Sequence, residues 1–468
     1  MPIPILGGTK VADTAYEIAN GIRFNDDDSP KLQKGMSAGN PDVWTFSTWV
    51  KRCSLKGAIG QTLFAAEVDG NNGTWILFDQ YEKLRVGNLV SGSWAGLYQT
   101  NRLWRDLSAW YHVVVLWNTA SGTAGERIRL WVNGIEETAF STETNPDQNQ
   151  NSWANQTDTT AYFRHGHNAG YNVYSDFYQA ETVFIDGTVY AASDFGEFDS
   201  TSPTMWKPKD VSGLTFGTNG YYLDFEDSAN LGNDANGGTD FDETNLAAAD
   251  QTIDTPTNNF CVMNPNDNFY CGGTLSEGNC RLVTGSTPYG QMLATFNVSS
   301  GKWYWEVKKV ADTGDSNSAM IGVSGAGVVG NTHGVGFSVA AMAYRSNGNK
   351  ETANVGSSYG DTYADGDIIG VALNLDDEEV TFYKNGTAQD SGTAIALTAV
   401  ALAPNEGYAP ALSDQSNDTY ATFDCNFGGC SAFAVSSGNA DGNGYGNFEY
   451  SVPSGFYSLC TKNLAEYG

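Results

Sequence analysis

Hydrophobic residues in this chain alternate with polar ones over short runs that end at Gly, Asn, Asp or Ser, a pattern typical of β-strands. No long segment repeats its hydrophobic residues at the helical period. Two runs end in an Asn-Gly pair, ERIRLWVNGIEE at 126–137 and DDEEVTFYKNGTAQ at 376–389. Both residue types tolerate the positive φ of a type I′ turn, so each run predicts a β-hairpin. One hairpin in each half of the chain indicates two β domains in tandem.

The first half has the pattern of one β-sandwich. Its predicted strands include 43–50, 62–68, 73–79, 110–117 and 128–134. Residues 113–117 are apolar without interruption, which predicts a strand covered on both faces. We therefore expect a sandwich over 41–227, preceded by residues 1–40 as an N-terminal arm and first strand.

Residues 228–257 are rich in Asn, Asp, Gly and Ala and have few large apolar side chains, so we expect a linker there. A second sandwich with a C-terminal extension is predicted over 258–468. In its run WYWEV, Trp303 and Trp305 share one strand face, whereas Glu306 lies on the other. The predicted fold class is all-β: two tandem, jelly-roll-like sandwiches joined by an Asn/Asp/Gly-rich linker.

Charge narrows the classes of partner. The 24 Lys and Arg face 54 Asp and Glu, a formal charge of −30 that repels nucleic acids and anionic membranes. No run reaches the ~18 apolar residues of a membrane span, and the first twenty residues lack a signal-peptide pattern, so we expect synthesis in a cytoplasm. The seven cysteines are too few and too scattered for a disulfide scaffold, and we expect most of them to be buried thiols.

Catalytic chemistry finds little support in the sequence. Glu67 and Asp69 alternate as the carboxylates of a sandwich glycanase do. The third carboxylate is missing, because Asn71 and Asn72 stand where it would follow. Among the four histidines, His112 lies in a core-like strand, and the pair His165 and His167 lacks a nameable third metal ligand. We predict no catalytic residue, no metal site and no cofactor, with a glycan hydrolase kept as an alternative.

Aromatic side chains remain as candidates for ligand contact, because a ring face stacks on the apolar face of a sugar. Trp94, Tyr98 and Trp104 lie in the polar stretch 91–110, where the first two are expected to be exposed and Trp110 buried. A second polar stretch, 344–367, predicts a long recognition loop. Its candidate ligand-binding residues are Tyr344, Arg345 and Tyr359.

Several spaced motifs also carry a family resemblance. The order GKWYWEV, IGV, GDIIGVALNLDDEEVTFYKNG and YAPAL over about 258–430 resembles the SPRY (B30.2-like) domain. FSTWVKR, WYHVVVLW and LWVNG in the first half are similar to concanavalin A-like, laminin-G-type sandwiches. The connecting segments, among them ETVFIDG (181–187), WKPK (206–209) and PSGFYSLCTKNL (453–463), resemble a family of tailed-bacteriophage proteins that combine both domains. NFGGCSAF (426–433) departs from that family's usual pattern.

The resemblance implies a non-enzymatic virion structural protein of a fibre, tail-associated or capsid-surface type. Its expected partners are host-surface or environmental glycans and neighbouring virion proteins, and its expected state is a homo-oligomer, with a trimer the favoured form. Two alternatives stay open. The chain could decorate or cement the capsid or tail with no receptor role, or it could be a polysaccharide depolymerase.

Overall fold

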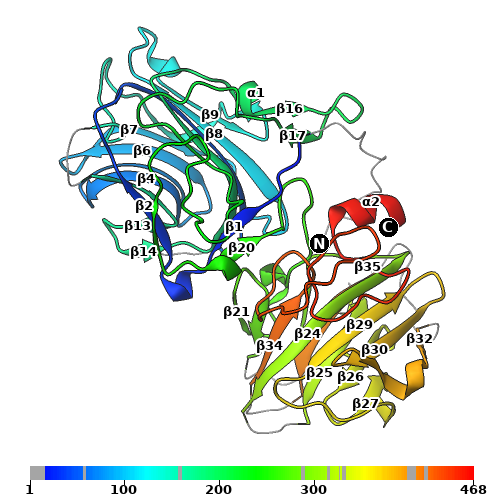
Figure 1. Ribbon diagram of the computed structural model, residues 1–468. Coiled ribbons are helices and arrows are strands. Elements are labelled where there is room, and N and C mark those ends of the chain that lie inside the picture. The colour runs from blue at the N-terminus through cyan, green and yellow to red at the C-terminus, as the bar shows by residue number, and fades with distance from the viewer. Residues whose placement is uncertain are drawn as a thin grey trace. The chain divides into compact units, whose positions relative to one another are not determined.

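The computed structural model describes residues 16–55, 60–156, 161–285, 290–313, 317–325, 327–328, 334–397, 407–415 and 420–468. These residues form two compact units, one within Ala12–Thr257 and one within Asn258–Gly468 (Figure 1). Both units are built from stacked β-sheets, as predicted, with the short helices α1 (Ala192–Phe195) and α2 (Thr461–Tyr467). Neither described helix is long enough to cross a bilayer.

The first unit is a sandwich of two eight-stranded sheets. One sheet, in spatial order, contains β10 (Ile135–Glu136), β9 (Ile128–Val132), β8 (Trp110–Asn118), β3 (Val43–Arg52), β15 (Phe177–Asp186), β1 (Gly21–Phe24) and β20 (Gln251–Thr252), with β18 (Tyr221–Leu223) paired to β15. The other contains β11 (Phe140–Thr144), β7 (Ser93–Thr100), β6 (Leu84–Val90), β5 (Asn72–Phe78), β4 (Gln61–Asp69), β12 (Tyr162–His165), β2 (Lys31–Gly35) and β19 (Asp242–Thr244). Two ribbons complete the unit: β13 (His167–Asn168) with β14 (Val173–Tyr174), and β16 (Gly196–Phe198) with β17 (Trp206–Pro208).

Strand β8 is covered on both faces, as its unbroken apolar run predicted. Val113, Val115 and Trp117 enter the core between the two sheets. Val114 and Leu116 point the other way, into an apolar cluster formed with residues of the segment 183–222. Its part between β15 and β18, residues 187–220 with α1 and the β16–β17 ribbon, therefore forms a third layer on the outer side of the β8 sheet.

Both predicted Asn-Gly hairpins are confirmed. Asn133 and Gly134 join β9 to β10 with φ values of 50° and 75°. Asn385 and Gly386 join β30 (Glu379–Lys384) to β31 (Thr387–Ala388) with φ values of 48° and 77°. Positive φ at both central positions is the requirement of the type I′ turn.

The expected linker and N-terminal arm lie largely inside the first sandwich. Within 228–257, Leu231 and Phe241 are buried in the main core, and β19 and β20 add strands to the two sheets. Within 1–40, β1 and β2 pair with β15 and β12, whereas residues 1–15 lie outside the described residues. The sequence assignment differed because edge strands are joined by backbone hydrogen bonds, which need few apolar side chains.

The second unit is a sandwich of a nine-stranded and a six-stranded sheet. The first contains β21 (Thr274–Ser276), β22 (Arg281–Val283), β34 (Ala421–Asn426), β24 (Lys302–Asp312), β29 (Ile368–Asn374), β30 (Glu379–Lys384) and β31 (Thr387–Ala388), with β32 (Ile395–Ala396) paired to β30 and β35 (Tyr457–Ser458) to β24. The second contains β23 (Gln291–Leu293), β33 (Tyr408–Asp414), β25 (Ala319–Gly325), β26 (Ala341–Arg345), β27 (Asn349–Thr352) and β28 (Val355–Ser358).

The core of the second sandwich follows the predicted alternation of β24. Trp303, Trp305 and Val307 are buried between the sheets. Tyr304 on the opposite face is also buried, because Phe448 of the C-terminal extension packs against it. All seven cysteine side chains of the chain are buried.

Candidate functional site

One of the six predicted ligand-binding residues lines a pocket. Trp94 lies in β7 on the outer face of its sheet, and 41% of its surface is exposed. The pocket, of about 220 Å³, is called here the sheet-face pocket. It is lined by Trp75, Leu77, Asp79, Gln80, Arg85, Gly87, Trp94, Asn168 and Tyr171.

The pocket exists because the sheet alternates apolar residues between its two faces. Ile76 and Phe78 of β5 point into the core, whereas Trp75 and Leu77 form an apolar cluster on the outer face. Trp94 meets Trp75 edge to face, with 6.3 Å between the ring centroids and an interplanar angle of 78°. The indole rings of β5 and β7 therefore meet across β6, the strand between them, and form one aromatic surface.

Gly87 of β6 determines how the ring of Trp94 lies. A Cβ atom at position 87 would stand only 2.5 Å from Cζ3 of Trp94. The absence of a side chain at this position lets the indole ring lie close against the strand. One ring face of Trp94 thus packs on the sheet, and the exposed part of the ring borders the pocket.

Charged groups border the aromatic surface. Arg85 Nη2 lies 3.2 Å from Asp79 Oδ2, and the Nε of Arg85 has no hydrogen-bond partner among the described residues. The other carboxylate oxygen of Asp79 accepts the backbone N–H groups of Tyr81 at 2.8 Å and Lys83 at 3.0 Å. Asp79 is therefore fixed in place, and it holds the guanidinium group beside the pocket.

A loop between β13 and β14 supplies the remaining wall. Glu67, which is fully buried, accepts the backbone N–H of Ala169 at 2.6 Å and that of Gly170 at 3.4 Å. The carboxylate also accepts the indole N–H of Trp75 at 2.7 Å and lies 3.3 Å from Nη1 of Arg164. Tyr171, half of whose surface is exposed, is thereby held at the edge of the pocket.

The carboxylates considered for a glycanase are engaged in structural contacts. Glu67 holds the loop, the ring of Trp75 and the guanidinium group of Arg164, as described above. Asp69 accepts hydrogen bonds from the backbone of Asn71 and the side chain of Asn72 within the β4–β5 turn. Burial and these bonds leave no approach to Glu67 from the pocket.

Tyr98 and Trp104 lie in the core of the first sandwich, where Tyr98 was expected to be exposed. Tyr98 is 2% exposed, and burial raises its pKa to about 12. The stretch 91–110 contains β7 instead of a plain loop, and β7 has a bulge: Leu89 pairs with Trp94, but Asn88 pairs with Gly96. The extra residue, Ala95, reverses the alternation, so Trp94 points outward and Tyr98 inward. Trp110 is buried, as predicted.

The stretch 344–367 is also not a plain loop. Strands β26, β27 and β28 cover most of its first half. Tyr344 and Tyr359 are buried in the core of the second sandwich, so neither offers a ring face for stacking. Nε of Arg345 donates a hydrogen bond to the carbonyl oxygen of Asn317 at 2.7 Å, and Nη1 of Arg345 lies 3.5 Å from Oε2 of Glu351.

His112 and His165 are buried and hydrogen-bonded within the first sandwich. His112 is buried, accepts the indole N–H of Trp206 at Nδ1, and bonds Ser47 through Nε2, while burial lowers its pKa to about 3. His165 bonds the carbonyl of Leu63 and the hydroxyl of Tyr221. His333 lies outside the described residues. Within the described ranges, no three His, Cys, Asp or Glu side chains gather as a metal site would require.

Comparison with known proteins identifies both domains. The family model for the SPRY domain matches residues 302–424, and that for the concanavalin A-like lectin/glucanases superfamily matches residues 26–194. The chain therefore contains a concanavalin A-like domain followed by a SPRY domain, as the motifs indicated. No curated protein shows significant sequence similarity to the chain.

Solved structures resemble single parts of the chain. The SPRY domain of human HERC1 is 20% identical, with a TM-score of 0.29, over 37% of this chain and 99% of that domain. A heptameric SAP-like pentraxin from Limulus polyphemus is 15% identical, with a TM-score of 0.27, over 38% of this chain and 80% of its own. A Bacteroides ovatus protein proposed to bind carbohydrate is 13% identical, with a TM-score of 0.36, over 49% of this chain and 59% of its own.

Proposed function

We propose that this chain is a non-enzymatic glycan-binding protein and that the sheet-face pocket holds the glycan. The observation that carries the proposal is the exposed ring of Trp94, which lies over Gly87 next to the ion pair of Arg85 and Asp79. The concanavalin A-like and SPRY domains fit a binding role for a glycan or a protein. The composition of the pocket favours a glycan as its ligand.

The chemistry of a sugar matches the two kinds of surface in this pocket. The C–H groups on one face of a pyranose ring pack on an aromatic ring, as Trp94 and Tyr171 offer. The hydroxyl groups at the rim of the pyranose need hydrogen-bond donors and acceptors, as Arg85 and Gln80 offer. Small-molecule sites commonly combine aromatic walls with a few polar groups of this kind.

We further propose that the protein is exposed on the virion of a tailed bacteriophage, as a fibre, tail-associated or capsid-surface protein. The similarity of the connecting segments to such virion proteins supports this location. Neighbouring virion proteins and further copies of the chain are then its expected protein partners. Labelling intact virions with a gold-conjugated antibody tests the location: gold on fibres or tail tip favours host adhesion, and gold over the capsid favours decoration.

Replacing Trp94 tests the binding site. We expect Trp94→Ala to weaken binding on an array of host-surface glycans about tenfold, because the stacking surface is lost. The melting temperature should stay within about 2 °C of the wild type, since an exposed side chain contributes little to stability. The matched control is Tyr81→Ala, which removes an aromatic residue that is 60% exposed and does not line the pocket. Full affinity in Trp94→Ala, or equal losses in both variants, would contradict the proposed site.

A further inference from the structure

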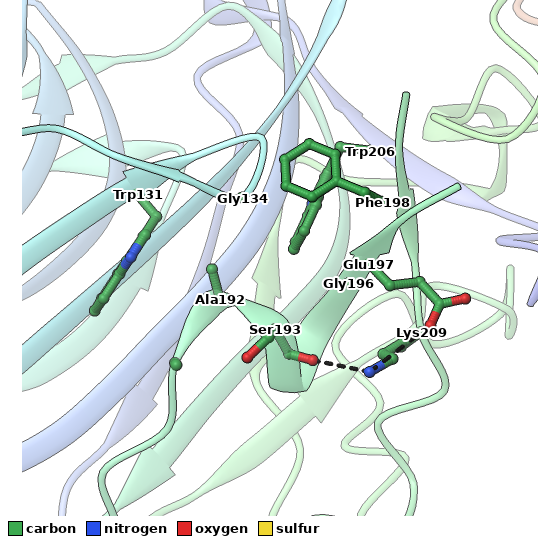
Figure 2. Close-up of a pocket in the computed structure, with 10 residues that line it drawn as sticks. Trp131, Gly134, Ala192, Ser193, Gly196, Glu197, Phe198, Trp206 and Lys209 are labelled. Carbon is green, nitrogen blue, oxygen red and sulfur yellow. Dashed lines mark hydrogen bonds and ion pairs between the residues drawn. The ribbon is translucent and has the colours of Figure 1, made fainter. Parts of the chain in front are cut away.

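The first sandwich has a second aromatic pocket, on its other sheet. The turn between β9 and β10 meets α1 and the β16–β17 ribbon there, and the space between them measures about 300 Å³ (Figure 2). We call it the hairpin pocket. Its apolar walls are Trp131, Gly134, Ala192, Gly196, Phe198 and Trp206.

Trp206 lies against two glycines in the hairpin pocket. A Cβ atom at Gly134 would stand 2.3 Å from the ring of Trp206, and one at Gly196 would stand 2.6 Å from it. Gly134 has a φ of 75°, so the type I′ turn and the close approach of the ring both favour glycine there. Trp206 is thus positioned as Trp94 is over Gly87.

Two further contacts fix the indole ring of Trp206. Its N–H donates to Nδ1 of His112 at 2.9 Å, and the buried imidazole is held on its other side by Ser47. Phe198 meets the ring at 70°, with 4.9 Å between the centroids, and is 42% exposed. Figure 2 shows Phe198 beside Trp206 and Trp131 across the turn at Gly134. The aromatic wall is therefore formed before any ligand arrives.

Polar groups line one side of the hairpin pocket. Lys209 Nζ donates to the carbonyl oxygen of Ser193 at 3.0 Å and lies 3.8 Å from Oε2 of Glu197 (Figure 2). The side chains of Ser193 and Glu197 are exposed. The pocket thus offers an ammonium, a carboxylate and a hydroxyl group next to its aromatic wall.

We propose that the hairpin pocket binds a single saccharide ring, which gives the first sandwich two glycan sites on opposite sheets. The proposal rests on the proposed function and extends it, because both pockets combine a tryptophan lying on glycine, a further exposed aromatic ring and a pair of opposite charges. An apolar amino-acid side chain would fill the space but leave the polar side unused. The volume lies at the lower limit of ~300–1,000 Å³ for small-molecule pockets, which suits one ring and not an extended chain.

Saturation-transfer NMR on the full chain tests the second site. The probes are the methyl glycosides of glucose, galactose, mannose, N-acetylglucosamine and glucuronic acid, with N-acetylphenylalaninamide as the amino-acid probe. We expect Trp94→Ala to keep a glycoside signal that comes from the hairpin pocket. In that background, Phe198→Ala should weaken the remaining affinity about tenfold. Ala191→Arg, which places a long side chain at an exposed wall position, should abolish the signal.

The outcomes separate this inference from the proposed function. The control Met205→Ala removes an apolar residue that is 43% exposed and does not line the pocket, and it should leave the signal intact. Loss of all glycoside binding in Trp94→Ala alone would overturn the second site and leave the proposed function standing. Binding that is unchanged in Trp94→Ala and is abolished by Ala191→Arg alone, in the wild-type background, supports the hairpin pocket and contradicts the sheet-face pocket. Binding of N-acetylphenylalaninamide in place of the glycosides, or of no probe, would overturn the saccharide assignment.

Discussion

Both sandwiches hold a distant segment of chain with a buried glutamate on the outer face of a sheet. Among the described residues, each has one glutamate with an exposed fraction of 0%, Glu67 in β4 and Glu306 in β24. Glu67 accepts the backbone N–H groups of Ala169 and Gly170, as described above. Glu306 accepts those of Glu449 at 2.9 Å and Tyr450 at 2.8 Å. In both units a carboxylate thus fastens a distant segment of chain across the sheet.

The two glutamates differ in charge compensation and in what the fastened segment covers. Glu67 has Arg164 as a counter-ion, whereas no Lys or Arg in the described chain forms an ion pair with Glu306. Burial accordingly raises the pKa of Glu306 to about 7. The loop between β13 and β14, which Glu67 holds, leaves Trp94 exposed. In the second unit, Phe448 packs over Tyr304. The same arrangement, a buried glutamate that holds a distant segment, therefore leaves the aromatic face of the first sandwich open and that of the second covered.

The largest expected effect comes from removing the counter-ion of Arg164. Glu67→Ala removes the carboxylate partner of the Arg164 guanidinium group, which is 90% shielded from solvent. It also removes the acceptor of the indole N–H of Trp75. Breaking one partner of a buried ion pair costs ~3–5 kcal/mol, so we expect a loss of about 4 kcal/mol in the first unit. Urea titration read by pulsed hydrogen exchange and mass spectrometry assigns the loss to peptides of one unit. A loss below about 1 kcal/mol would show that the Glu67 carboxylate stabilises neither the loop nor Arg164.

The covered face of the second sandwich should be nearly as sensitive. Phe448 is fully buried and meets Tyr304 edge to face, with 5.2 Å between the centroids. Phe→Ala substitutions at buried sites cost ~3–5 kcal/mol, and a site at the margin of the fold can collapse in part, so we expect Phe448→Ala to cost about 3 kcal/mol. The same urea titration should place the loss in the second unit. Phe269→Ala, at a residue 88% exposed, is the control. Equal stability of both variants would mean that the extension does not cover the sheet.

The alternation of strands was predictable because the period of two is local. The side chains alternate between the two faces of each strand, as the sequence pattern requires, in β8 from Val113 to Trp117 and in β24 from Trp303 to Val307. The Asn-Gly turns were predictable for the same reason, since two residues determine the turn type. Which residues of a strand face the core, and which residues form a hairpin turn, thus depend on neighbours within a few positions.

The contacts that decide the site were not predictable from local pattern. A single extra residue, Ala95, decides that Trp94 faces outward and Tyr98 inward, and no composition signal marks that bulge. Glu306 is covered by residues more than 140 positions later in the chain. The hairpin pocket brings together Gly134, Gly196 and Trp206, whose proximity follows from tertiary packing alone. An aromatic residue in polar sequence is therefore a poor guide to an exposed ring.

The missing counter-ion of Glu306 predicts a pH dependence. Its pKa is about 7 in the folded protein and 4.5 as the ordinary value, so the folded state binds the proton more tightly. The stability that this group contributes is fully present below pH 4.5 and is lost as the pH rises through about 7. At 1.36 kcal/mol for each pKa unit, a pKa raised from 4.5 to about 7 corresponds to a loss of about 3 kcal/mol.

Glu306→Gln tests this pH dependence because glutamine cannot ionise. Its stability relative to the wild type should improve by about 3 kcal/mol between pH 4.5 and pH 8, measured by urea titration of the second unit at both values. Glu466→Gln, at an exposed position of α2, controls for the loss of one negative charge. The assignment is wrong if the difference between Glu306→Gln and the wild type stays constant with pH.

The smallest expected effect on stability tests the open face most directly. In Gly87→Ala, the new Cβ would meet the ring of Trp94 at 2.5 Å, and this exposed ring can swing away at a cost below about 1 kcal/mol. A displaced ring would no longer meet Trp75 edge to face beside the pocket, so glycan affinity should fall about tenfold, as in Trp94→Ala. Gly35→Ala is the matched control, because a Cβ there would meet no atom within 4 Å. If Gly87→Ala keeps full affinity on the glycan array, the position of Trp94 over the glycine is irrelevant to binding, and the openness of the first sandwich would be a matter of packing alone.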